Sequence, residues 1–169
     1  MKKLVALILS LCMLLGCGAA MADNEMNWED VAPTLEAVGI TGQFYTFEQI
    51  AVAIFIPDGM ELAAEMPSEK FIGLFTAPDG SYVAVTYVDL NGMDLETYAT
   101  VLPEVGAASI EMGTLNGLPC VTYEMPENGT MNVAFTTEAG YVLEVYTGPV
   151  TTDEEKLGGS VILASVQSL

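Results

Sequence analysis

Four short apolar segments in the second half of the chain are separated by glycine-containing turns, and this pattern most restricts the folds that the chain can adopt. The connections are Asn116-Gly117, Glu127-Asn128-Gly129 and Glu138-Ala139-Gly140. Connections this short join antiparallel neighbours, because a parallel crossover needs a dozen or more residues. We therefore predict an antiparallel meander of four strands, over 109–115, 120–125, 131–136 and 141–147.

The first half of the chain predicts four more strands. Residues 44–47 and 50–56 are rich in β-branched and aromatic side chains, and 50–56 is apolar on both faces, as in a central strand. Residues 71–76 and 82–88 flank Ala77-Pro78-Asp79-Gly80, in which proline and glycine occupy positions that favour a turn. These last two strands are therefore expected to form a hairpin.

Two helices are predicted before and between the strands. The first is indicated by apolar residues at helical spacing before Gly39, namely Trp28, Val31, Leu35 and Val38. Pro33 either lies in the first turn of a helix that starts near Ala32 or kinks one that starts near Asn27. A shorter helix is expected to begin near Asp94 and to end by Pro103.

A third helix is expected near the end of the sequence. Thr152 and Glu155 have the spacing of a capping box, and apolar residues continue to Leu169. Gly158 and Gly159 lower the helix propensity here, which indicates a close approach to the sheet. The element order predicts an α+β fold, with a mostly antiparallel sheet of about six to eight strands and helices packed on its faces.

Several local sequences resemble the PsbP-like superfamily. They are Ile56-Pro57-Asp58-Gly59 at a strand end, Gly140-Tyr141 before a strand, and Ile162-Leu163-Ala164-Ser165-Val166 in the third helix. The superfamily includes extrinsic photosystem II proteins, a small yeast nuclear-import factor and exported bacterial proteins, and the resemblance spans residues 43–169. It implies a PsbP-like α/β/α sandwich and an accessory or binding role rather than catalysis. None of the family's ligand positions has a counterpart in this chain.

The first 22 residues have the pattern of an export signal. Lys2 and Lys3 precede an apolar run over 4–15, which is shorter than the roughly 20 residues that a membrane-spanning helix needs. Two processing routes remain open. Cys17 follows a lipobox-like sequence and would be lipidated after removal of residues 1–16, whereas Ala20-Met21-Ala22 favours cleavage after residue 22. We expect an extracytoplasmic protein, either a membrane-anchored lipoprotein or a secreted one.

The rest of the chain divides into two parts. Residues 23–42 are expected to form an acidic N-terminal segment with the first amphipathic helix, and residues 43–169 a single domain. Without the signal the chain has two lysines against 23 carboxylates, a formal charge of −21, and it has no arginine or histidine. Such a surface repels nucleic acids and anionic lipids, so we expect membrane contact only through a lipid anchor. A protein, peptide or small ligand, cationic in character, remains as a partner.

The residue types exclude several chemistries. Without histidine, neither a Ser-His-Asp nor a Cys-His arrangement is available, and the usual zinc ligands are missing. Calcium, which takes oxygen ligands, is the one metal that we consider. Its candidate ligands are Asp89, Asn91, Asp94 and Glu96, and the alternative for this cluster is a turn followed by an acidic helix N-terminus.

A carboxylate-dependent carbohydrate-active enzyme is a further alternative. Such an enzyme needs two carboxylates about 5 to 9 Å apart, and a chain with 23 of them offers pairs by chance. Cys120 lies in an apolar run and is expected to be a small buried side chain. We therefore expect an exported, non-catalytic accessory or binding domain without a cofactor, with calcium binding as the principal alternative.

Overall fold

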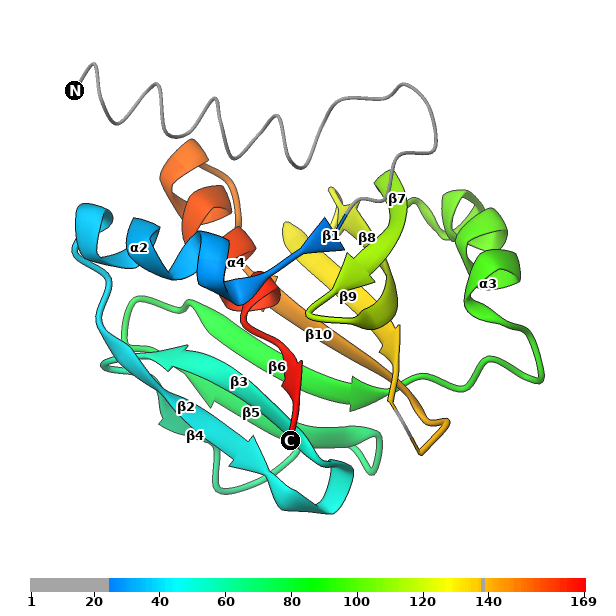
Figure 1. Cartoon of the computed structure of the whole chain (residues 1–169), viewed down its shortest axis with the longest axis horizontal. Helices are drawn as coiled ribbons and strands as arrows, with labels where there is room; N and C mark the ends of the chain where they lie inside the picture. The colour runs from blue at the N-terminus through cyan, green and yellow to red at the C-terminus, as the bar shows by residue number, and fades with distance from the viewer. Residues whose placement is uncertain (1–24, 138) are drawn as a thin grey trace.

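The computed structural model describes residues 25–137 and 139–169, which form two β-sheets and three α-helices (Figure 1). The larger sheet has eight strands in the order β1-β7-β8-β9-β10-β6-β5-β4, and the smaller has the order β11-β3-β2. The strands are β1 (Glu25–Met26), β2 (Gly42–Phe47), β3 (Val52–Pro57), β4 (Glu61–Leu62), β5 (Phe71–Thr76), β6 (Tyr82–Tyr87), β7 (Ala108–Leu115), β8 (Leu118–Met125), β9 (Thr130–Thr136), β10 (Val142–Gly148) and β11 (Gln167–Ser168). The predicted α+β class is confirmed, although the strands divide between two sheets.

The predicted meander is confirmed. Strands β7, β8, β9 and β10 are antiparallel neighbours in the larger sheet, with Cys120 opposite Phe135 and Val145 opposite Val133. The β5–β6 hairpin also forms where it was expected. The parallel pair in this sheet is β1 with β7, where Glu25 lies opposite Thr114.

The helices are α2 (Trp28–Val38), α3 (Leu95–Val101) and α4 (Asp153–Ala164). Of the two starts considered for the first helix, the structure has the earlier, so Pro33 lies inside α2, and Gly39 ends the helix with a φ of 75°. The capping box of α4 is present: Glu155 N–H donates to Thr152 Oγ1 at 3.2 Å, and Thr152 N–H donates to Glu155 Oε2 at 2.9 Å. No helix of the described residues is long and apolar enough to cross a membrane.

Two predicted boundaries were wrong, and a third was confirmed. The strand expected from Ile50 starts at Val52, because residues 48–50 form a 3₁₀ turn and Ala51 has a φ of 52°. The second helix, α3, begins after its N-cap Asp94 and ends at Val101, as predicted, and a 3₁₀ turn over 102–105 follows, with Pro103 in its first turn, where a missing N–H costs little. The third helix ends at Ala164 rather than continuing to 169, and β11 then pairs with β3.

The main core lies between the two sheets and α4. Strand β3 is buried on both faces: Ile54 points into the main core, and Phe55 packs with Val31 and Leu35 of α2. In Figure 1, α2 and α4 lie together on one side of the molecule, and α3 lies on the other. A third cluster joins α3 to the larger sheet, and its buried members are Leu95, Leu102, Val121, Tyr123 and Ala134.

Gly159 brings α4 against the larger sheet. A Cβ at this position would lie 2.9 Å from Thr147 Cγ2 and 3.3 Å from Val150 Cγ1, so a larger residue would push the helix outward. Nothing lies within 4 Å of a Cβ placed on Gly158. The predicted close approach is therefore confirmed for Gly159 and wrong for Gly158.

Asn116 joins three distant parts of the chain. It occupies the β7–β8 turn with a φ of 47°. Its Oδ1 accepts a hydrogen bond from Trp28 N–H at 2.6 Å, and its Nδ2 donates to the carbonyl oxygens of Ala164 at 2.9 Å and Val166 at 2.7 Å. One side chain therefore holds the start of α2, the end of α4 and the meander together.

We expect Asn116→Ala to destabilise the fold strongly. The substitution removes three partly buried hydrogen bonds, each contributing about 1 kcal/mol, and it places alanine in the left-handed region at a further cost of about 1 kcal/mol. Chemical denaturation should therefore show a loss of about 3–4 kcal/mol in the free energy of unfolding.

Asn91→Ala is the matched control. Asn91 has a φ of 51° and is followed by glycine, as Asn116 is, but its side chain lies in an exposed turn. This variant should lose only the backbone contribution of about 1 kcal/mol. Equal losses in the two variants would contradict the role assigned to the Asn116 amide.

Candidate functional site

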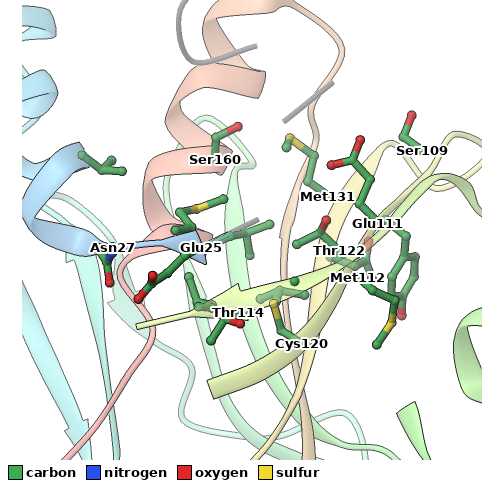
Figure 2. A pocket seen from close by; sticks show the side chains of 18 of the residues that line it. Glu25, Asn27, Ser109, Glu111, Met112, Thr114, Cys120, Thr122, Met131 and Ser160 are labelled. Atoms are coloured by element: carbon green, nitrogen blue, oxygen red, sulfur yellow. The ribbon is translucent and has the colours of Figure 1, made fainter. Parts of the chain in front are cut away.

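A pocket of about 430 Å³ opens between α4, β1 and the strands β7 to β9. In Figure 2, Glu25 and Ser160 lie on one side of this pocket, and Glu111 and Thr122 lie on the other. The volume is within the range of small-molecule sites, which are concave and mostly apolar with a few polar groups. The sequence alone did not predict this pocket.

The pocket has an apolar interior and an acidic margin. Its apolar surface is supplied by six different elements, through Met26, Val31, Leu115, Cys120, Met131, Val133 and Leu163. Four carboxylates also line it: Glu25, Asp30, Glu111 and Glu124. The pocket therefore offers contact area for an apolar group and negative charge for a basic one.

The carboxylates differ in their surroundings. Lys156 Nζ of α4 lies 3.2 Å from Glu124 Oε2, which neutralises that acid. Burial raises the pKa of the Glu111 carboxyl above its ordinary value. Removal from water disfavours the charged form of an acid, and a bound cation would offset that cost. Glu111 is thus the pocket acid that gains most from a cationic ligand.

The four residues predicted to bind calcium form a turn and a helix start. Asp89 Oδ1 accepts a hydrogen bond from Asn91 N–H at 2.9 Å, and Asp94 Oδ1 accepts one from Thr97 N–H at 2.8 Å. The bond from Thr97 lowers the pKa of Asp94. Glu96 lies in the first turn of α3.

These local bonds match the alternative that was considered for the cluster. Within residues 25–137 and 139–169, no group of three or more Asp, Glu, Cys or His side chains is placed to hold a metal ion. Calcium binding at Asp89, Asn91, Asp94 and Glu96 therefore stays a prediction, without a preformed set of carboxylates to support it. The predicted lipid attachment at Cys17, like the whole signal, lies outside the described residues.

Cys120 is buried on the inner face of β8, as the sequence indicated. It is 4% exposed, and burial raises the pKa of its thiol to about 12. Because the thiolate is the reactive form, the thiol stays protonated and inert at neutral pH even though it borders a pocket.

We expect the Cys120 thiol to react with iodoacetamide at pH 8 much more slowly in the folded protein than in urea. A thiol with its ordinary pKa of about 8.5 is partly ionised at pH 8, whereas a pKa of about 12 lowers the thiolate fraction by a factor on the order of 10³. Mass spectrometry of the peptide that contains Cys120 measures this residue separately from the other cysteines. Similar rates with and without urea would show that the thiol is not held in the apolar interior.

Comparison with known proteins gives similarities of backbone structure only. No family model matches the chain, and no curated protein matches it significantly. The crystal structure of the Saccharomyces cerevisiae Ran-binding protein Mog1p aligns with a TM-score of 0.46 and 9% identity, over 76% of this chain and 96% of Mog1p. A structure from Bacteroides thetaiotaomicron aligns with a TM-score of 0.44 and 13% identity, over 76% of this chain and 48% of that one.

Proposed function

We propose that this protein is an exported, non-catalytic binding domain of PsbP-like architecture, and that the pocket of Figure 2 holds its ligand. The observation that carries the proposal is the pocket itself, a cavity of about 430 Å³ with an apolar interior bordered by four carboxylates. The export signal over 1–22 supports a site of action outside the cytoplasm. The local sequences that resemble the PsbP-like superfamily, such as Ile56-Pro57-Asp58-Gly59, support the proposed PsbP-like architecture.

The ligand that fits the pocket is a small amphipathic molecule with a primary amine. Its apolar part would lie against Met131, Val133 and Leu163, and its ammonium group near Glu111. The large negative charge of the whole chain raises the local concentration of cations. An anionic ligand of the same shape would be repelled.

A binding role also agrees with the chemistry of the pocket. Its hydroxyl groups include Ser109, Thr122 and Ser160, and the chain has no histidine to activate them as nucleophiles. The Ser160 hydroxyl donates its hydrogen bond to the Lys156 carbonyl oxygen at 2.8 Å, within α4. These groups are suited to orienting a ligand.

Octylamine and octanoate test the proposal, because they share an apolar chain and differ in the sign of the charge. Isothermal titration calorimetry of the purified protein at pH 7 should show binding of octylamine and none of octanoate. Glu111→Gln should weaken octylamine binding by about three- to tenfold, as expected for a partly exposed ion pair.

Glu104→Gln is the matched control for this experiment. Glu104 is exposed in the turn after α3 and does not line the pocket, so its substitution changes the net charge equally and leaves the site intact. Its affinity for octylamine should equal that of the original protein. Equal binding of amine and carboxylate, or an equal loss in both variants, would refute a basic ligand in this pocket.

Export makes a separate prediction about the N-terminus. Cells that process the signal should yield a protein that begins either at a lipidated Cys17 or at Asp23. Intact mass spectrometry separates the two, and Cys17→Ala should abolish the lipidated form only. An uncleaved chain in the cytoplasmic fraction would contradict export and leave the binding proposal to its own experiment.

A further inference from the structure

A second cleft, of about 640 Å³, lies on the outer face of the larger sheet beside α3. Main-core residues such as Val133 and Val145 point to the inner face, so their neighbours on β9 and β10 point outward into this cleft. Five tyrosines line the cleft, namely Tyr82, Tyr87, Tyr98, Tyr123 and Tyr146. The pocket of Figure 2 does not explain this concentration of aromatic rings.

A carboxylate lies among the tyrosines. Glu144 Oε1 accepts hydrogen bonds from the Tyr123 hydroxyl and, at 2.7 Å, from Asn132 Nδ2. Asn132 is held in turn by Thr130, whose hydroxyl donates to Asn132 Oδ1 at 2.8 Å. Both bonds fall on Oε1 of Glu144, and together they fix the position of the carboxylate.

Two pairs of rings in the cleft stand nearly perpendicular, and each pair has a member near this carboxylate: Tyr123 donates to it, and Tyr146 lies two residues along the same face of β10. Tyr98 and Tyr123 have centroids 6.4 Å apart and planes at 78°, and Tyr82 and Tyr146 have centroids 6.2 Å apart and planes at 85°. The negative charge of Glu144 contributes to raising the pKa of Tyr146, after the larger effect of burial, which places that ring close to the carboxylate. Perpendicular rings present both faces and edges around a common space.

The sheet register sets the distance between the two pairs. Tyr123 and Tyr146 both lie opposite Asn132, one on each neighbouring strand. Their backbones are therefore about 10 Å apart, which is twice the spacing between strands, and the Glu144 carboxylate lies over Asn132 between them.

The charges around the cleft favour a single cation. Glu144 lies at its centre, Asp89 lies at its margin, and Lys70 lies at the end near β5, two strands away from β10. Lys156, the other lysine among the described residues, is paired with Glu124. The cleft therefore has a net negative charge around its aromatic walls.

We propose that this cleft binds a quaternary ammonium group, held against the partly exposed rings of Tyr82, Tyr98 and Tyr146 and facing the Glu144 carboxylate. Aromatic rings attract such a cation through their negatively charged faces, and its methyl groups require no hydrogen-bond acceptors. The carboxylate compensates the charge, and its existing bonds to Tyr123 and Asn132 hold it in place before the ligand arrives. Glu144 and Glu111 lie on opposite faces of the sheet, although Tyr123 and Asn132 line both this cleft and the pocket of Figure 2.

A carbohydrate is the main alternative for a cleft with tyrosines and amide groups. Sugars lie flat against one open ring face, whereas the ring pairs here stand at 78° and 85° and present ring faces in different directions. The chain charge of −19 also adds attraction for a cation and none for a neutral sugar. The geometry therefore favours the ammonium group.

Choline and 3,3-dimethylbutan-1-ol test the proposal, because the alcohol has the same shape without the charge. Titration calorimetry of the purified protein at constant ionic strength should show binding of choline and none of the alcohol. Glu144→Gln keeps an oxygen that can accept from Tyr123 and Asn132 but removes the charge. This variant should fold normally and weaken choline binding about tenfold or more.

Tyr146→Ala removes one wall and should cause a loss of similar size. Glu104→Gln and Tyr45→Ala are the matched controls, since Glu104 and Tyr45 do not line the cleft. Each control should bind choline within twofold of the original protein, and circular dichroism should confirm that every variant is folded.

Three results would overturn the proposal. They are equal binding of choline and the alcohol, unchanged choline affinity in the folded Glu144→Gln variant, and binding of cellobiose without any binding of choline. The octylamine experiment measures binding near Glu111, on the other face of the sheet. If octylamine does not bind, the choline titration still tests the site at Glu144. If choline does not bind, the octylamine titration still tests the site at Glu111.

Discussion

The hydrogen bonds of the Asn116 side chain fix the relative positions of the sheets, α2 and α4. The side-chain amide bonds to backbone groups that are 88 positions and about 50 positions away in the sequence. The backbone N–H of Asn116 also donates to the Met26 carbonyl oxygen, at 2.8 Å. Strand β1, one wall of the pocket in Figure 2, is therefore held by the turn that joins β7 to β8. A short turn and a binding pocket thus depend on the same residue.

Locally determined elements of this fold could be predicted, and non-local ones could not. The meander depends on turn sequences such as Asn116-Gly117, and the start of α4 depends on Thr152 and Glu155, all of which act within a few residues. Strand β11 has no such signal, because Gln167 pairs with Ala53, more than 100 residues away. The second sheet was missed for the same reason: nothing near 50–56 shows which strands will become its neighbours.

The candidate sites show a similar division. The acids near Asp89 were predicted to bind calcium because they are close in sequence. In the structure, the side chains of Asp89 and Asp94 accept hydrogen bonds from nearby backbone N–H groups. The pocket of Figure 2 combines β1, three strands of the meander and α4, so only the folded chain brings its residues together. Glu144 alternates with the buried Leu143 and Val145 along β10, so it lies on the other face of the strand. Its contact with Tyr123 required the register of three strands.

The attachment of α3 has a consequence for the dynamics of the outer cleft. This seven-residue helix joins the larger sheet through the cluster of Leu95 and Leu102, apart from the main core, and it carries Tyr98, part of the cleft wall. Small elements with separate packing open locally without global unfolding. We therefore expect local opening of α3 to leave both sheets intact. A ligand in the cleft would therefore slow hydrogen exchange of the α3 amides, even if the free energy of unfolding of the whole domain did not change.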